Sequence, residues 1–429
     1  MGITVLVCVG LLGCQTLGPG FLNRFVDERG MAVAADAGGN ICVTGEFSGS
    51  ADFDPGPAVE ERTSIGGSDI FLCKYDSTGN FLWARTWGGA RHLDFAGAVG
   101  VDSSGDIYAA GIFENTVDFD PGPGLDEHTA SHSPGFWVTK FDESGDWLWT
   151  RTWDGAMWDV NLGLTIDGSG NVLVTGQFSG QVDFDPGPGE ESHKWNGNCD
   201  TFCSEFDSTG NFLGVRTSGG TKDSRCRVVA ADRSGNTFVA GFFGGTVDFD
   251  PGPTVDMHAC NGWWDVYLIK FRSPGDFFFD STETFLWART WGGPSVDYAW
   301  GLAVDSGGSA YITGYFSESV DFDPGPGVDN HESEGDWDIY VSKLDSSGNF
   351  LWARTWGGGG RDQGYGVAVD GAGNVLVTGS FSGAVDFDPG SGVDKRKSNS
   401  DSDVFLSKFD SSGNFLWART WGGANRVVP

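Results

Sequence analysis

Histidine is the residue type in this sequence best suited to acid–base or metal chemistry, because imidazole titrates near neutral pH and binds metals. Five of the six histidines lie in irregular segments that follow Asp-Phe-Asp-Pro-Gly strings, and the sixth is His92. A ligand or metal site near Cys199, His258 and Cys260 is one interpretation, but no Cys-x2-Cys or His-Glu-x-x-His spacing supports zinc. The other interpretation of their placement is that polar residues commonly occur in loops. The five loop histidines are His128, His132, His193, His258 and His331.

Six aspartates form a second candidate group, because each precedes by eight or nine residues an Asp that closes a short apolar segment. Brought together, such carboxylates would raise one another's pKa unless a cation offset the repulsion, and Ca²⁺ prefers several oxygen ligands. The alternative is local: each Asp accepts backbone N–H bonds beside it, which the regular recurrence favours. The residues are Asp27, Asp94, Asp159, Asp223, Asp297 and Asp362.

The string Asp-Phe-Asp-Pro-Gly places two acids close together, as in glycosidases, where two carboxylates flank one bond. A catalytic pair is needed once, however, and this string occurs six times. We therefore interpret it as a structural turn with a buried Phe, since Pro and Gly suit adjacent turn positions. The copies begin at Asp52, Asp118, Asp183, Asp248, Asp321 and Asp386.

The string Trp-x-Arg-x-Trp places two indoles and a guanidinium on one face of a strand. Arg stacks on Trp, and we expect each guanidinium to pair with an Asp of its own or a neighbouring repeat. A carbohydrate-stacking Trp ladder is the functional alternative to core packing. The third copy departs from the pattern, with Glu205, Gly214 and Ser218 in place of Lys, Trp and Trp. The arginines are Arg85, Arg151, Arg216, Arg289, Arg354 and Arg419.

These strings belong to six tandem copies of one repeat, whose starting points are 66, 65, 65, 73 and 65 residues apart. The sixth copy predicts four strands, at 365–370, 375–381, 403–409 and 415–421, joined by Asp-x-x-Gly-Asn turns and one longer connection. Repeated four-stranded units predict an all-β fold, a six-bladed β-propeller. We expect one domain at 21–423, with blades near 21–89, 90–155, 156–220, 221–293, 294–358 and 359–423.

In such blades the second-to-third connections and the blade linkers emerge on one face, where loops on a rigid scaffold suit binding. Here the second-to-third connections vary, whereas the tight turns resemble one another. The loop histidines lie in these connections together with Trp195, Trp263, Trp264 and Trp337. These residues therefore form the predicted binding surface.

The sixth copy, with Gly-x-Val-Ala-Val-Asp, Gly-Asn-Val-x-Val-Thr-Gly and Gly-Asn-x-Leu-Trp, resembles the SBBP-type β-propeller repeat of bacterial surface and secreted proteins. The resemblance covers about residues 21–423. The family is named for seven blades, so seven is the alternative blade number. It implies the fold and an extracytoplasmic location, secreted or at the bacterial cell surface, but no agreed enzymatic activity.

The N-terminal segment 1–20 has two interpretations. Its apolar start and the Leu-Leu-Gly-Cys string ending at Cys14 resemble an export signal with a lipobox, which implies a lipid anchor. However, the basic start typical of such signals is missing, so Val5–Leu17 is alternatively a strand left from a lost copy. The stretch is too short for a transmembrane helix. Residues 424–429 form a tail.

The composition excludes some classes of binding partner. The net charge of −33 opposes binding to nucleic acid and to anionic membranes, which leaves a protein or a glycan as partner. The sequence has no Gly-x-Ser-x-Gly elbow, P-loop or dinucleotide fingerprint. The eight cysteines do not follow the repeat, and Cys199 with Cys226 or Cys260 is the pairing worth testing.

We therefore expect a non-catalytic, extracytoplasmic binding scaffold without a cofactor, apart from possible Ca²⁺. One alternative is a carbohydrate-active lyase or hydrolase that uses His and acids of the same loops. The other is a calcium-stabilised structural surface protein.

Overall fold

The fold of the chain is given by a computed structural model that describes residues 28–90, 94–131, 134–155, 162–250, 252, 254–272 and 285–422. Within these ranges the secondary structure is all β, and no helix capable of crossing a membrane occurs. Several predicted features lie outside the described residues. They are segments 1–20 and 424–429 with Cys14, and also Asp27, His92, His132 and Asp159.

Six antiparallel four-stranded blades account for most of the structure, which confirms the predicted fold class. Blades one and two contain β1 (Glu28–Ala35), β2 (Ile41–Phe47), β5 (Asp69–Tyr75) and β6 (Phe81–Trp87), then β7 (Phe95–Val101), β8 (Ile107–Phe113), β11 (Gly135–Phe141) and β12 (Trp147–Asp154). Blades three and four contain β13 (Gly163–Ile166), β14 (Val172–Phe178), β17 (Asp200–Phe206) and β18 (Phe212–Gly220), then β19 (Ser224–Ala231), β20 (Thr237–Phe243), β23 (Asp265–Phe271) and β24 (Phe285–Trp291). Blades five and six contain β25 (Tyr298–Val304), β26 (Ala310–Phe316), β29 (Asp338–Leu344) and β30 (Phe350–Trp356), then β31 (Gln363–Val369), β32 (Val375–Phe381), β35 (Asp403–Phe409) and β36 (Phe415–Trp421).

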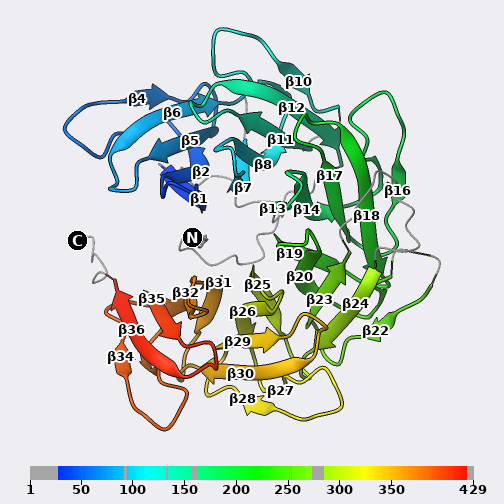
Figure 1. Cartoon of the computed structure of the whole chain (residues 1–429), viewed down its shortest axis with the longest axis vertical. Coiled ribbons are helices and arrows are strands. Elements are labelled where there is room, and N and C mark those ends of the chain that lie inside the picture. Colours follow the sequence, from blue (N-terminus) through cyan, green and yellow to red (C-terminus); the bar gives the residue numbers. More distant parts are fainter. Residues whose placement is uncertain are drawn as a thin grey trace.

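The blades lie around a central axis, with β1, β7, β13, β19, β25 and β31 innermost (Figure 1). Each inner strand packs against the inner strand of the next blade, from β1 through to β31. Most of the core lies between blades, since single hydrophobic clusters join blades one and two, two and three, four and five, and five and six. Each blade thus buries one face against its neighbour.

The predicted Asp-x-x-Gly-Asn turns form as expected. In the last one, Asp410 Oδ1 accepts the backbone N–H bonds of Ser412 (2.8 Å) and Asn414 (2.9 Å). The amide of Asn414 donates to Oδ2 of the same Asp (2.8 Å), and Gly413 has a φ of 78°. These bonds, the side-chain bond from Asn414 first, lower the pKa of Asp410.

The second-to-third connections, expected to be irregular, instead contain a ribbon of two three-residue strands in every blade. In the second ribbon, Asp118 Oδ1 accepts the N–H bonds of Asp120 (3.1 Å) and Asp126 (2.8 Å), and Phe119 is buried. The Asp-Phe-Asp-Pro-Gly string is therefore the structural turn we predicted. The ribbons are β3 (Ser50–Asp52) with β4 (Glu61–Thr63), β9 (Thr116–Asp118) with β10 (Glu127–Thr129), β15 (Gln181–Asp183) with β16 (Ser192–Lys194), β21 (Thr246–Asp248) with β22 (Met257–Ala259), β27 (Ser319–Asp321) with β28 (Asn330–Glu332), and β33 (Ala384–Asp386) with β34 (Lys395–Lys397).

The junction between blades three and four differs from the others. Its Trp residues are replaced by Gly214 and Ser218, and Arg216 stacks on Phe271 of blade four (5.2 Å) and lies 3.9 Å from Glu205. Strand β18 continues past the end of the sheet and pairs with β21 of blade four. Direct backbone pairing thus accompanies the loss of the indoles at this junction.

Candidate functional site

The loop histidines are structural members of their own blades, not a shared ligand cluster. His331 Nδ1 lies 2.8 Å from Thr355 Oγ1 and Nε2 lies 3.2 Å from Asp329, while the ring contacts Phe322 edge-on (5.4 Å). His128, His193 and His258 repeat the contact with a threonine of the fourth strand and with the buried Phe. Arg62 and Arg396 occupy the same ribbon position in blades one and six. These four histidines thus have a packing role within their own blades, and their predicted binding role stays a prediction.

The spacing of these histidines could have indicated this role. His331 follows the first Asp of its string, Asp321, by ten residues, and the other three follow theirs at the same interval. A residue that occupies one position of every copy has a local task, whereas a shared site needs residues that differ between copies.

Four members of the predicted ring of six aspartates lie within the described residues, and these four do not share one position. Asp94, Asp297 and Asp362 share one position, but blade four has Ser224 there, and Asp223 lies one residue earlier in the linker. Asp94, Asp297 and Asp362 are fully or almost fully buried between blades, so they do not line an open channel mouth.

Both oxygens of these three carboxylates bind linker amides. Asp362 Oδ2 accepts from Gly358 N (2.8 Å) and Oδ1 from Ser382 N (2.8 Å), and Asp94 and Asp297 make the same pair of bonds. Burial, the larger influence, raises the pKa of Asp94 and Asp297 to about 7 and that of Asp362 to about 6. The described residues hold no group of three or more His, Cys, Asp or Glu suited to a metal ion. Calcium binding stays a prediction.

The arginines of the fourth strands lie over the first Trp of their own string, as expected, but most of their partners are not carboxylates. Arg354 stacks on Trp352 (5.4 Å), and its Nε donates to the carbonyl of Gly413 in the next blade (2.8 Å). Arg85, Arg151 and Arg289 bind Gly145, Gly210 and Gly348 in the same way. Arg85 also lies within ion-pair distance of an aspartate of the next blade, Asp146 (3.7 Å). The carbonyl of the turn glycine is therefore the shared partner of these four guanidinium groups.

The structure does bring together one set of residues that the repeat does not explain. It lies at the ends of the inner strands of blades four to six, beside the second-to-third connections (Figure 1). Arg227 stacks on Trp300 of the next blade (4.1 Å), and Trp300 contacts Tyr365 of the blade after that (5.9 Å). We call the set the aromatic–arginine cluster: Arg225, Arg227, Phe242, Trp264, Tyr298, Trp300, Tyr315, Trp337, Arg361 and Tyr365.

A second line of ring contacts runs through the same cluster. Phe242 contacts Trp264 (5.2 Å) and Tyr298 (4.5 Å), and Tyr298 contacts Tyr315 (4.9 Å). Tyr315 then contacts Trp337 (5.1 Å), on which Arg361 stacks (4.5 Å). The cluster therefore spans three blades without interruption. Its Trp side chains are half-buried and Arg361 is exposed, so part of each line faces solvent.

Several members of the cluster have no counterpart in blades one to three, although Arg29 and Phe95 stand where Arg225 and Tyr298 do. Trp264 and Trp337 immediately precede the third strand, where Ser68, Pro134, Cys199 and Ser402 stand in the other four copies. Tyr315 and Phe242 stand where blades one to three have Glu46, Ile112 and Gln177. Of the predicted surface, Trp264 and Trp337 belong to the cluster. Its other members were missed, although aligning the copies shows them as departures from the repeat.

The comparisons with known proteins follow from the blades just described. Residues 351–380, from the fourth strand of blade five to the second strand of blade six, match the family described as SBBP, beta-propeller repeat. This segment is an SBBP repeat. The resemblance predicted from the sequence is confirmed.

Two curated relatives are longer than this chain. An uncharacterized WD repeat-containing protein of Acanthamoeba polyphaga mimivirus is 24% identical over 472 residues, which cover 91% of this chain and 33% of that protein. The regulatory protein FlaEY of Caulobacter vibrioides is 30% identical over 164 residues, which cover 37% of this chain and 17% of that protein. The chain spans about a third of the length of the first relative and less of the second.

Among solved structures, a protein of unknown function from Bacteroides caccae aligns with a TM-score of 0.29 at 12% identity, over 73% of this chain and 93% of that one.

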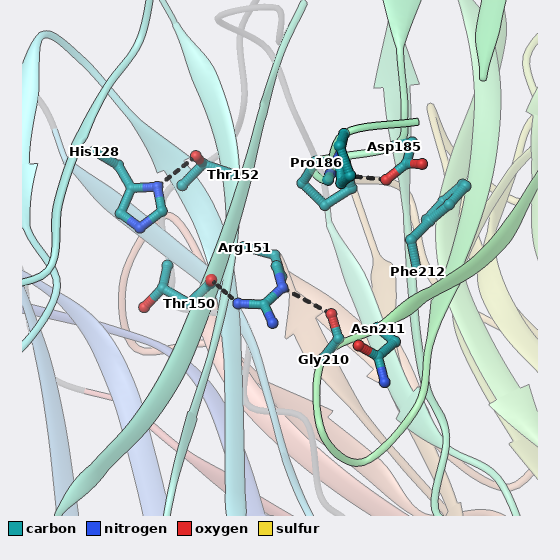
Figure 2. A pocket seen from close by; sticks show the side chains of 11 residues that line it. His128, Thr150, Arg151, Thr152, Asp185, Pro186, Gly210, Asn211 and Phe212 are labelled. Atoms are coloured by element: carbon teal, nitrogen blue, oxygen red, sulfur yellow. Dashed lines mark hydrogen bonds between the residues drawn. The ribbon is translucent and has the colours of Figure 1, made fainter. Parts of the chain in front are cut away.

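Open grooves lie between neighbouring blades. One of about 420 Å³ lies between His128 and Arg151 of blade two and the turn Asp185–Pro188 of blade three, and Figure 2 shows Arg151 reaching Gly210 beside it. A counterpart of about 460 Å³ lies between blades four and five, along His258 and Arg289. Both grooves are lined by the residues that dock one blade on the next, so their shape follows from the repeat.

The remaining predicted residues divide between core and surface. Trp195 is partly buried against the core shared by blades two and three, whereas Trp263 is 74% exposed. The described cysteines are free thiols, so the pairing of Cys199 with Cys226 or Cys260 is not formed. Burial raises the pKa of Cys199 and Cys226 to about 11.

Proposed function

We propose that this chain is a non-catalytic, extracytoplasmic binding scaffold that recognises a protein partner through the aromatic–arginine cluster. The observation that carries the proposal is the run of ring contacts across blades four to six, at positions where blades one to three have other residues. Residues that differ from those at the same position of the other copies do not have the structural role that the repeated residue has there. Their convergence on one surface points to recognition.

The residue types favour a protein partner. Trp, Tyr and Arg dominate the binding energy of protein–protein interfaces when they lie in a packed, partly desolvated centre. Arg227 over Trp300 and Arg361 over Trp337 are stacked in this way, which holds both side chains in place before a partner arrives. The net charge of −33 favours basic or neutral partners by long-range attraction.

The extracytoplasmic location is supported by the SBBP resemblance. The mimivirus relative is named for WD repeats, which are another class of propeller repeat. A glycan is the alternative partner, because indole rings also stack on sugars. A lyase or hydrolase finds less support, because His128, His193, His258 and His331 are each engaged within their own blade.

The test is a parallel screen of the immobilised chain against a random peptide display library and a glycan array. The same screen is run on a Trp264→Ala/Trp337→Ala variant and on Leu351→Ala, an exposed residue of the outer strand of blade five. We expect peptides that bind the wild-type chain and Leu351→Ala but not the double variant. Glycan binding lost in the double variant would overturn the protein assignment, and binding equal in all three proteins would overturn the site.

A further inference from the structure

Partly exposed rings alternate with buried rings along one line of the aromatic–arginine cluster. The order of contacts along this line is Trp264, Phe242, Tyr298, Tyr315 and Trp337. Phe242 and Tyr315 are buried, whereas Trp264, Tyr298 and Trp337 are only half-buried. The surface therefore presents three rings to solvent, held in place by the two rings between them.

The spacing of these three rings suits a helical repeat. Phe242 lies 5.2 Å from Trp264 and 4.5 Å from Tyr298, and Tyr315 lies 4.9 Å from Tyr298 and 5.1 Å from Trp337, between ring centroids. Neighbouring half-buried rings are thus at most about 10 Å apart. A polyproline II helix has three residues per turn and rises about 3.1 Å per residue, so one of its faces repeats every ~9 Å. The rings can therefore contact successive turns of such a helix.

The hydrogen-bonding groups of the cluster are mostly donors. Its three Trp and three Arg side chains can only donate, and its three Tyr side chains can donate or accept. The two carboxylates that contact the cluster already pair with its arginines, Asp223 with Arg225 (3.5 Å) and Asp336 with Arg361 (3.4 Å). A ligand that complements this surface is therefore rich in acceptors and poor in donors.

Charge restricts the ligand further. The three arginines of the cluster repel a cationic segment at close range, and the net charge of −33 repels an acidic segment at long range. An uncharged segment meets neither repulsion. The acceptors of the ligand are therefore main-chain carbonyls and not carboxylates.

We propose that the protein partner binds through an uncharged, proline-rich segment in the polyproline II conformation, whose pyrrolidine rings pack on Trp264, Tyr298 and Trp337. Proline has no backbone N–H, and this helix has no internal hydrogen bonds, so its carbonyls are free to accept. The helix is also largely ordered before binding, which lowers the entropic cost of association. The inference rests on the proposed function and names the chemistry of its partner.

Two other ligands match the surface less well. A peptide that extends a β-sheet needs a strand edge, but the inner strands β19 and β25, which carry Arg227 and Trp300, each pack against the next blade. A sugar stacks on indole rings, but its hydroxyl groups donate as well as accept. The donors of a sugar would find few acceptors among the side chains of the cluster.

The experiment is a calorimetric titration of decaproline, acetylated and amidated so that it is uncharged, into the full chain. A Gly-Ser peptide of equal length and the same end groups is the flexible control. We expect decaproline to bind the wild-type chain and Leu351→Ala equally, and the Gly-Ser peptide to bind at least about tenfold more weakly. Trp337→Ala should weaken decaproline binding at least about tenfold. Trp337→Phe, which keeps a ring but loses the N–H, should fall between.

Each variant must melt cooperatively before titration. If Trp337→Ala does not, Arg361→Ala replaces it, because this side chain is 57% exposed and its removal leaves the packed rings in place. We expect Arg361→Ala to weaken decaproline binding severalfold, about fivefold, through the loss of a donor.

Two results would overturn the inference. One is decaproline binding no tighter than that of the Gly-Ser peptide, and the other is equal decaproline binding by the wild-type chain and the folded variants. The display screen then separates the two levels of the proposal. Selected peptides that lack proline but need Trp264 and Trp337 would leave the proposed function in place. Selected peptides that bind without these residues would overturn the proposed function as well.

Discussion

At the scale of single residues, the Trp-x-Arg string and the turn glycine of the next blade work as one unit. Glycine is required at this turn position for two reasons. Its φ is positive, and the indole of the preceding blade lies against it. In blade six a Cβ on Gly413 would be 3.0 Å from Trp352 and 3.2 Å from Arg354 Nε. Trp, Arg and Gly, which lie 61 residues apart at their extremes, therefore recur together although they belong to different copies.

Gly413→Ala should destabilise the chain by about 1–3 kcal/mol, because it adds both backbone strain and a clash with Trp352. Chemical denaturation measures the change. Gly371→Ala is the matched control, since its Cβ would meet nothing within 4 Å and its φ is ordinary, and we expect a change within about 0.5 kcal/mol. Gly79→Ala, with positive φ but no indole, should fall between them. Equal losses at Gly413 and Gly371 would contradict the docking role.

His331→Ala should destabilise the chain by about 1–2 kcal/mol, because it removes the hydrogen bond to Thr355 and the edge contact with Phe322. His331→Arg should be tolerated, since Arg396 occupies this position in blade six and binds Asp394. Thermal unfolding distinguishes the two. A loss of peptide binding without a loss of stability in His331→Ala would instead favour a ligand role.

At the scale of elements, three blade linkers are held by a buried carboxylate that binds two amides. Asp297 Oδ2 accepts from Gly293 N (2.7 Å), and Oδ1 lies 3.4 Å from Ser317 N. Its nearby buried Asp265, at the start of the third strand, has its pKa raised, chiefly by burial. A Cβ on Gly292 would lie 2.5 Å from that Asp265, so the glycine after the last Trp makes room for the carboxylate.

These raised pKa values predict that stability falls as pH rises. The folded state holds protons on Asp94 and Asp297 up to a pKa of about 7, whereas the unfolded chain releases them near the ordinary value of 3.8. The contribution is therefore complete below about pH 4 and lost as pH rises through about 7. The melting temperature should be higher at pH 5 than at pH 8.

The Asp297→Asn variant removes only the contribution of the Asp297 carboxyl to the pH dependence of stability, because every other negative charge of the protein remains. It should reduce the difference in melting temperature between pH 5 and pH 8, while the exposed Asp336→Asn should leave the difference unchanged. A wild-type chain that is more stable at pH 8, or an Asp297→Asn variant with the wild-type difference, would contradict the assignment.

The strands and tight turns could be predicted from the sequence alone. The strands follow from alternating apolar and polar residues, and the turns follow from Asp and Gly at fixed positions. It was not enough for contacts that depend on neighbouring blades. The carbonyl partners of Arg354 lie in the next copy, and the register shift that moves Asp223 out of the Asp362 position appears only in the pairing of β19 with β20. Apart from Trp264 and Trp337, the members of the aromatic–arginine cluster were missed, because they come from first strands, second strands and a blade linker that meet only in the radial arrangement.

At the scale of the whole molecule, one repeat fixes the framework, and the proposed binding site lies where residues depart from that repeat. Immediately before the third strand, blades one to three have Ser, Pro and Cys, whereas blades four and five have Trp264 and Trp337. Most blades share the same docking contacts, so these substitutions change the exposed surface but not the arrangement of the blades. The chain therefore has a differentiated half, and the proposed partner site lies there.

The most direct test of this account is a calorimetric titration of a peptide selected by the wild-type chain into four proteins: wild type, Trp337→Ala, Tyr365→Ala and Leu351→Ala. All four must show cooperative melting before titration. The account predicts that Trp337→Ala and Tyr365→Ala bind at least about tenfold more weakly, a loss of about 1.4 kcal/mol, while Leu351→Ala binds like the wild type. Equal affinity in all four proteins would show that the partner is recognised elsewhere.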